Sequence, residues 1–239
     1  MSTDVSGARE KISVHLRAPR SASDIPPLTG LILAGGQSRR LGQDKALVRI
    51  GNAGPTLVER VASALRPLCD EILLVGGESA RYAFLELPVV PDIYAEAGAL
   101  GGIYAGLCAA SHEHALAVGC DMPFLNPALL RYMADLPRDY DVLVPRWARE
   151  AGGAGQLYTP KNELAAQTLH AIYGRACQPF MRALLAERAG ERRVIAFFPQ
   201  VRVRYVEPDE VAQFDPAGRS FFNVNTPAQL RQAEGFPWD

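Results

Sequence analysis

The sequence has little net charge and few cysteines, and each scarcity excludes a class of protein. The 239 residues include 25 basic and 26 acidic side chains, a formal net charge of −1. No field of one sign therefore attracts nucleic acid or an anionic membrane, and any anion site must be local. The four cysteines, Cys69, Cys108, Cys120 and Cys177, include no C-x-x-C pair, so neither a zinc site nor a disulfide framework is indicated.

Long apolar runs are also missing. No stretch approaches the ~18 apolar residues of a membrane helix, and the N-terminus has no apolar signal core. With 48% hydrophobic and 21% charged residues, the composition favours a folded protein with a sizeable core. We therefore expect a soluble, cytoplasmic protein that binds neither nucleic acid nor membranes.

Two familiar phosphate-binding patterns are absent from the glycine-rich part of the chain. The P-loop reads G-x-x-x-x-G-K-[ST], but here five residues separate Gly36 from Gly42, and Ala46 follows Lys45. The dinucleotide fingerprint G-x-G-x-x-G is excluded because Gly35 and Gly36 are adjacent.

Residues 31–45 nevertheless contain the parts of a phosphate site, LILAGGQSRRLGQDK. The first four residues are apolar and suit a buried strand. Gly35 and Gly36 let the backbone turn sharply and aim N–H groups at an anion. Two arginines and Lys45 add positive charge suited to polyphosphate. The alternative is a glycine-rich turn with solvated charges, which this combination of residues disfavours.

Short apolar runs alternate with helical patterns after residue 28. The expected strands are 31–34, 71–75, 87–90, 115–119 and 141–144, and the expected helices are 55–68, 79–85, 102–110 and 127–135. This alternation predicts an α/β fold with a doubly wound, mostly parallel sheet and helices on both faces.

Ligands bind such sheets beyond the carboxyl ends of the strands. The strand endings here are Gly35–Gly36, Gly76–Gly77, Asp92 and Asp121, which form a coherent polar edge.

The remaining chain is less regular. We expect strands at 156–159 and 201–206, and helices at 177–189 and from Thr226–Pro227 to about Ala233. Residues 1–28 are expected to be a flexible N-terminal extension, and 29–239 a single domain.

Three polar residues near strand ends are candidate ligands. Asp121 suits Mg²⁺, which prefers one or two protein oxygens plus substrate phosphates, or it caps the turn before Pro123. Asn223 and Asn225 point to the same side of an extended segment. They either bind a cation or substrate oxygens, or make ordinary strand-end and helix-cap hydrogen bonds.

Several motifs resemble one known family. Residues 33–45, LAGGQSRRLGQDK, fit L-A-G-G-x-S-x-R-[ML]-G-x-D-K, the signature of the molybdenum cofactor guanylyltransferases, which are MobA-like nucleotidyltransferases with a Rossmann-like fold. CDMP at 120–123 and NVNTP at 223–227 match the family's C-D-x-P and N-[IV]-N-T-P. The resemblance spans about residues 29–234.

The resemblance implies a set of site residues. Catalytic roles fall to Lys45, Arg39 and Asp121. The metal ion is Mg²⁺, held by Asp121 and Asn225. Nucleotide-binding positions are Leu33, Ala34, Gly35, Gly36, Ser38, Arg39, Gly42, Lys45, Asp92, Gly98, Leu100 and Gly101. Residues 29–145 would form the nucleotide-binding half and 146–239 the acceptor-binding half.

Three further segments either match the family's motifs only in part or depart from them. Residues 98–103, GALGGI, resemble its G-P-L-x-G-[IL], with Ala99 in place of proline. Gly76–Gly77 stands where several members have asparagine. HAIY at 170–173 resembles a strand near the acceptor, so His170 joins Asn223 and Asn225 as an acceptor-binding candidate, although a lone histidine is often structural.

The implied reaction is transfer of GMP from GTP to the terminal phosphate of molybdopterin, with release of pyrophosphate. Insertion proteins or apo-molybdoenzymes would then receive the cofactor. Rival readings are a CTP-dependent enzyme and a transferase with another phosphorylated acceptor. A sugar-1-phosphate nucleotidyltransferase would carry G-x-G-T-R, which is missing. A non-catalytic nucleotide sensor could lose Lys45 and Asp121, so their presence argues against that class. The CTP branch tends to carry Ala-Ala-Gly, so Ala34–Gly35–Gly36 favours GTP.

Overall fold

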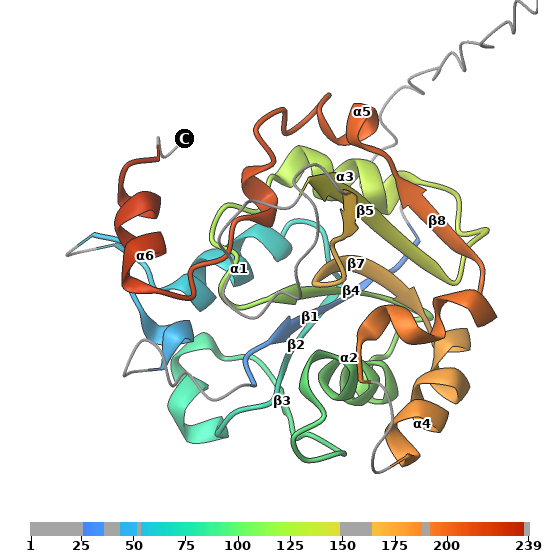
Figure 1. The fold of residues 1–239 in the computed structure, drawn as a ribbon. Coiled ribbons are helices and arrows are strands. Elements are labelled where there is room, and N and C mark those ends of the chain that lie inside the picture. The colour runs from blue at the N-terminus through green and yellow to red at the C-terminus, as the bar shows by residue number, and fades with distance from the viewer. Residues whose placement is uncertain (1–25, 36–43, 52–53, 149–163, 188–191, 237–239) are drawn as a thin grey trace, which may run out of the picture.

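The computed structural model describes residues 26–35, 44–51, 54–148, 164–187 and 192–236, and the expected strand at 156–159 lies outside them. A twisted sheet runs through the centre of the molecule (Figure 1). Among the described residues it has eight strands in the order β3-β2-β1-β4-β7-β5-β6, with β8 also paired to β5. The strands are β1 (Thr29–Leu33), β2 (Glu71–Val75), β3 (Val89–Val90), β4 (His114–Gly119), β5 (Val142–Ala148), β6 (Leu164–Ala166), β7 (His170–Gly174) and β8 (Val203–Val206).

The strands of the first half are parallel, and the second half mixes directions. Strands β3, β2, β1 and β4 run parallel to one another. Strand β7 enters antiparallel between β4 and β5, while β8 is parallel to β5. The predicted α/β fold is confirmed, and strands from both halves of the chain share the sheet.

Helices cover both faces of the sheet (Figure 1). The α-helices are α1 (Leu57–Leu65), α2 (Gly98–Ala109), α3 (Pro127–Asp135), α4 (Gln178–Ala186), α5 (Pro208–Val211) and α6 (Pro227–Glu234). Short 3₁₀ helices are η2 (Lys45–Leu47), η3 (Ser79–Leu85), η4 (Arg175–Cys177), η5 (Val194–Gln200) and η6 (Arg219–Phe221). Alternate residues of β1 separate the two layers: Ile32 packs with α1 and α3, whereas Leu31 and Leu33 pack with α2 and α4.

Local capping explains two of the helix starts. The Asn126 side chain accepts from the N–H groups of Ala128 and Leu129, and Pro127 occupies the first turn. This helix begins where the sequence predicts. Thr56 and Glu59 form a capping box at α1, so this helix starts after Thr56 rather than at Pro55.

Helix α2 begins at Gly98, four residues before the expected start at 102. Its glycines let it lie close to the sheet. A Cβ on Gly106 would stand 2.6 Å from the Leu31 side chain, and one on Gly102 would stand 3.3 Å from Leu33. The second and third turns of α2 thereby lie directly against β1.

A third apolar cluster joins the C-terminal part of the chain to the segment after Lys45. Val48, Ile50 and Leu57 pack with Phe222 and Val224. Residues from opposite ends of the sequence are thus brought to one side of the sheet.

The described structure begins within the expected N-terminal extension, and Leu28 is already fully buried. None of the described helices is long and apolar enough to cross a membrane.

Candidate active site

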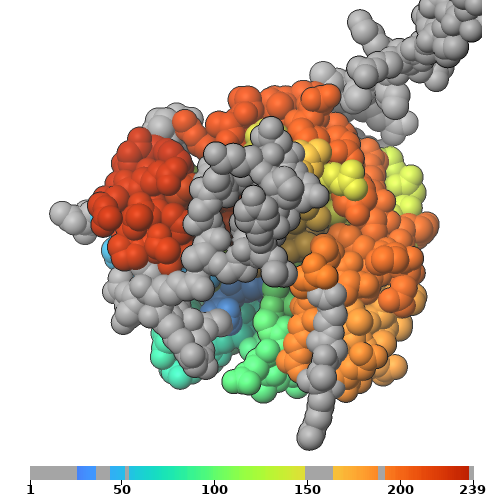
Figure 2. Space-filling model, viewed as in Figure 1, coloured from blue at the N-terminus to red at the C-terminus, as the bar shows by residue number. Residues whose placement is uncertain are grey.

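A cavity of about 780 Å³ opens at the carboxyl ends of the parallel strands. Leu33, Val75 and Gly119 are paired in register and mark this edge on three neighbouring strands. In Figure 2 the blue surface of the first described segment adjoins the green surface of the α2 region on one face of the molecule. The cavity lining is Leu33, Gly35, Lys45, Val75, Asp92, Glu96, Ala97, Gly98, Ala99, Gly102, Gly119, Asp121 and Leu169. The predicted ligand edge of the sheet is therefore hollow.

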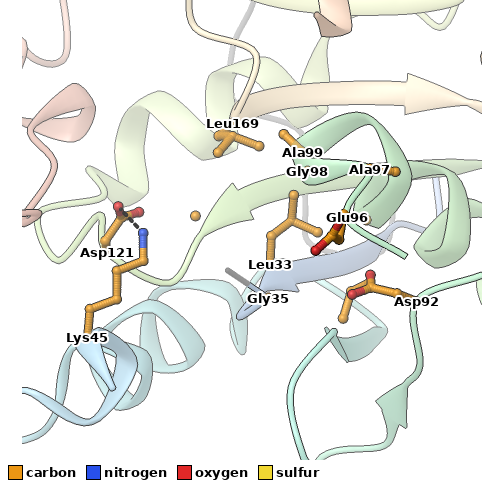
Figure 3. Close-up of a pocket in the computed structure, with 13 residues that line it drawn as sticks. Leu33, Gly35, Lys45, Asp92, Glu96, Ala97, Gly98, Ala99, Asp121 and Leu169 are labelled. Atoms are coloured by element: carbon orange, nitrogen blue, oxygen red, sulfur yellow. Dashed lines mark hydrogen bonds and ion pairs between the residues drawn. The ribbon is translucent and has the colours of Figure 1, made fainter. Parts of the chain in front are cut away.

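Lys45 and Asp121 form an ion pair at one end of the cavity (Figure 3). The Lys45 ammonium lies 2.8 Å from Asp121 Oδ2 and 3.4 Å from Asn225 Oδ1. The Asp121 side chain is 8% exposed and that of Lys45 is 24% exposed. A carboxylate and an amide oxygen thus converge on one cation.

The fold brings these three residues together from three separate segments. Asp121 follows β4, Lys45 opens η2, and Asn225 precedes α6. The Val224 N–H donates to the Asp121 carbonyl at 2.9 Å, which ties the Asn225 segment to the end of β4. The Val224 side chain is fully buried in the cluster that also holds Val48.

Two opposing effects act on the charge of Lys45. Burial, the largest single effect, would lower the pKa of the ammonium. The attraction of Asp121 and its hydrogen bond, together with contributions from Cys120 and Asp44, outweigh burial, so the pKa of Lys45 is raised. Lys45 is therefore a cation at neutral pH.

Two glycines from neighbouring strand ends meet at the floor of the cavity, beside the Leu33 side chain. Gly35 lies two residues after β1 and faces Gly76, which follows β2 at φ 77°. A Cβ on Gly76 would lie 2.8 Å from Gly35 Cα, so this position requires glycine. The Gly35 N–H donates to the Val75 carbonyl at 3.3 Å, and the Ala34 N–H donates to the same oxygen at 2.9 Å.

Two carboxylates lie at the other end of the cavity. Figure 3 shows Asp92 and Glu96 across from Lys45 and Asp121, with Gly35 between them. A molecule with anionic groups at one end and N–H or O–H donors at the other fits this polarity.

The chain matches a family model described as the MobA-like NTP transferase domain over residues 30–204. The chain belongs to this MobA-like NTP transferase family.

Its relatives match nearly their whole length. A probable molybdenum cofactor guanylyltransferase of Pelotomaculum thermopropionicum is 40% identical over 205 residues, 86% of this chain and 91% of the relative. One of Chloroflexus aggregans is 35% identical over 87% of this chain and 94% of the relative. The crystal structure of molybdopterin-guanine dinucleotide biosynthesis protein A from Archaeoglobus fulgidus, at 24% identity, superposes with a TM-score of 0.67 over 86% of this chain and 96% of that one, which shows the shared fold.

The structure of this MobA-like chain places several sequence-predicted residues at the cavity and leaves others outside the described residues. Those lining it are Leu33, Gly35, Lys45, Asp92, Gly98 and Asp121. Asn225 contacts Lys45, whereas the Asn223 amide donates to the Phe221 carbonyl at 3.0 Å. The predicted positions Gly36, Ser38, Arg39 and Gly42 lie outside the described residues.

Three predicted nucleotide-binding residues do not line the cavity. Ala34 is 7% exposed and Leu100 fully buried, each within an apolar cluster, and neither lines the cavity. Gly101 is also buried away from it. On α2 the residues that line the cavity are Gly98, Ala99 and Gly102, because a helix turns neighbouring residues by about 100°.

Sequence reasoning did not single out Val75, Glu96, Ala97, Gly119 or Leu169 as cavity residues. Val75 and Gly119 end predicted strands, so their place at the edge was implied by the strand assignment. Glu96 adopts a left-handed conformation with φ 56°, which no local pattern indicates.

His170 lies in the core, which corrects its assignment to acceptor binding. It begins β7 and is fully buried, with its ring edge-on to Phe221 at 5.1 Å. Neither ring nitrogen has a hydrogen-bond partner in the described part of the chain. Burial lowers the pKa of His170 to about 4, although nearby Asp215 opposes this shift.

This burial makes the protein less stable in acid. Since the unfolded imidazole titrates near 6.5, the unfolded state binds more protons between pH 6.5 and 4. The stability that depends on a neutral His170 is fully present above pH 6.5, and about 2 kcal/mol of it is lost by pH 5. We expect the free energy of unfolding in urea to decrease between pH 7.5 and pH 5 in both the parent protein and His170→Leu. The decrease in the parent protein should be about 2 kcal/mol larger. Equal pH dependence in both proteins would contradict this origin.

Proposed function

We propose that this protein transfers GMP from GTP to the terminal phosphate of molybdopterin, forming the guanine dinucleotide cofactor and pyrophosphate. The observation that carries the proposal is the Lys45–Asp121 pair at the ligand edge of the sheet. It occurs in a chain 40% identical over most of its length to a relative named for guanylyl transfer.

The reaction is an in-line displacement in which an anionic phosphate oxygen of the acceptor attacks the α-phosphorus of GTP. The new P–O bond forms as the bond to the β-phosphate oxygen breaks, and the electron pair leaves with pyrophosphate. The attacking oxygen is already ionised, so the protein contributes position and charge neutralisation. Lys45 and Arg39 hold the β- and γ-phosphates and stabilise the departing pyrophosphate.

The residues at the phosphate end also fit Mg²⁺. Asp121 and Asn225 already direct two oxygens at one cation, the Lys45 ammonium. Mg²⁺ takes one or two protein oxygens together with substrate phosphates. When bound there, the ion offsets negative charge on the phosphates. Among the described residues no cluster of three His, Cys, Asp or Glu side chains occurs, and substrate phosphates and water would supply the remaining oxygens.

The base end favours guanine over cytosine. The N1–H and 2-amino groups of guanine are adjacent donors, and Asp92 and Glu96 offer carboxylate acceptors. Cytosine presents its amino donor beside the N3 acceptor, which a carboxylate repels. Several members of the family have an asparagine where this chain has Gly76–Gly77. In this chain the carboxylates of Asp92 and Glu96 would recognise the base instead.

Residues 146–239 are proposed to hold the acceptor, with Asn223 beside the bound molybdopterin. Residues 29–145 hold the nucleotide. The completed cofactor would pass to an insertion protein or to an apo-molybdoenzyme.

Calorimetric titration with GTP, CTP and ATP, each with and without Mg²⁺, tests the nucleotide assignment. We expect Mg²⁺–GTP to bind at least about tenfold more tightly than Mg²⁺–CTP, because cytosine sets its N3 acceptor against a carboxylate where guanine offers a donor. Pyrophosphate release with molybdopterin then tests the transfer. Preference for CTP would assign the protein to cytidylyl transfer, and tight GTP binding without molybdopterin-dependent pyrophosphate release would indicate another phosphorylated acceptor.

A further inference from the structure

Asp44, immediately before Lys45, has both carboxylate oxygens engaged. Its Oδ1 accepts from the Ala46 N–H at 3.1 Å and caps the turn that Lys45 opens. Its Oδ2 accepts from the Tyr82 hydroxyl at 2.8 Å and from Arg81 Nη1 at 3.2 Å. The backbone at Lys45 is therefore anchored through one carboxylate to η3.

Tyr82 is the buried partner in this network. Tyr82 is 2% exposed, whereas the Arg81 side chain is 46% exposed and also pairs with Glu78. An exposed ion pair contributes little, so the tyrosine hydroxyl is the principal restraint on Asp44. Burial, followed by the bond to Asp44, raises the pKa of Tyr82 well above its ordinary value, which keeps the hydroxyl a donor.

The glycine after β2 makes room for this tyrosine. Gly77 has φ 81°, and a Cβ there would lie 2.7 Å from the Tyr82 ring. A larger residue at 77 would therefore strain the backbone and push the ring from its place. Gly76–Gly77, where this chain departs from several members of the family, thus makes room for the Tyr82–Asp44 hydrogen bond. That bond lies next to Lys45 at the phosphate end of the cavity.

We propose that Tyr82 is a positioning residue for the nucleotidyl transfer, acting through Asp44 to hold Lys45 toward Asp121 and the nucleotide phosphates. The inference rests on the proposed function, because that function assigns the nucleotide phosphates as the groups that Lys45 binds. Tyr82 does not line the cavity, so its effect on a ligand is indirect.

Tyr82→Phe tests this role because it removes only the hydroxyl. The matched control is Tyr132→Phe, since the Tyr132 hydroxyl also donates to a carboxylate, that of Glu210, away from the cavity. We expect Tyr82→Phe to weaken Mg²⁺–GTP binding about tenfold and to raise KM more than it lowers kcat, while Tyr132→Phe binds like the parent protein. Similar melting temperatures in the two variants would separate this effect from stability. Equal GTP affinities in the two variants would overturn the proposal.

A double-mutant cycle identifies the route. In an Asp44→Ala background, Tyr82→Phe is expected to leave GTP affinity unchanged, because the carboxylate through which it acts is gone. A full tenfold effect in that background would overturn the proposal. If Asp44→Ala does not fold, the comparison of Tyr82→Phe with Tyr132→Phe decides.

Pyrophosphate is the probe that separates this inference from the proposed function. Parent protein that binds pyrophosphate but not GTP would defeat the GTP assignment, and the same variants then test Tyr82 with pyrophosphate. Parent protein that binds GTP normally, with Tyr82→Phe unaffected, would defeat the positioning role alone.

Discussion

Asp121→Asn is expected to lower the rate of guanylyl transfer at saturating GTP roughly a hundredfold, because it removes the carboxylate on which charge neutralisation at the phosphates depends. Asparagine has the same shape, and the backbone bond from Val224 to the Asp121 carbonyl does not involve the side chain. The fold is therefore expected to survive.

The same substitution separates metal binding from nucleotide binding. Without the carboxylate, the Lys45 ammonium is no longer held 2.8 Å from Asp121 Oδ2 and is released toward the phosphates. We expect calorimetry to show GTP binding that persists but no longer depends on Mg²⁺. The control is Asp209→Asn on the exposed side of α5. Unchanged turnover, or Mg²⁺ dependence equal to that of the control, would contradict a metal role for Asp121.

Lys45→Ala is expected to lower turnover at least about tenfold and to weaken GTP binding by a similar factor, since a cation facing the β- and γ-phosphates is lost. It also leaves Asp121, with a side chain only 8% exposed, without that counter-ion. Leaving a buried charge without its partner is costly, so the melting temperature without ligand is expected to fall.

Metal binding should change in the opposite direction. The Lys45 ammonium and a divalent ion compete for the same Asp121 oxygen, so Mn²⁺ titration without nucleotide is expected to show tighter binding in Lys45→Ala than in the parent protein. Lys45→Met is the companion variant, because it keeps most of the apolar stem and changes mainly the charge. Near-normal turnover in both Lys45→Ala and Asp121→Asn would defeat the proposed function.

Local chemistry in the sequence predicted much of the fold. Asn126 and Pro127 start α3 where expected, because a side-chain cap and a proline act within one turn. The glycine-rich start of α2 was missed by four residues, since glycines carry no apolar periodicity. Strand β7 was indicated only by resemblance, and its antiparallel place between β4 and β5 depends on pairing partners distant in the chain.

The sequence by itself determined the α/β class, the polar residues at the strand ends and, through its motifs, the family, because these depend on neighbouring residues and their order. Tertiary structure alone decided that Asn225 lies 3.4 Å from Lys45 across 180 positions of sequence. It also decided that His170 is buried rather than exposed to an acceptor, and that Tyr82 reaches Asp44. Which side chains face a cavity and which face the core depends on how elements pack, and a local pattern does not contain that information.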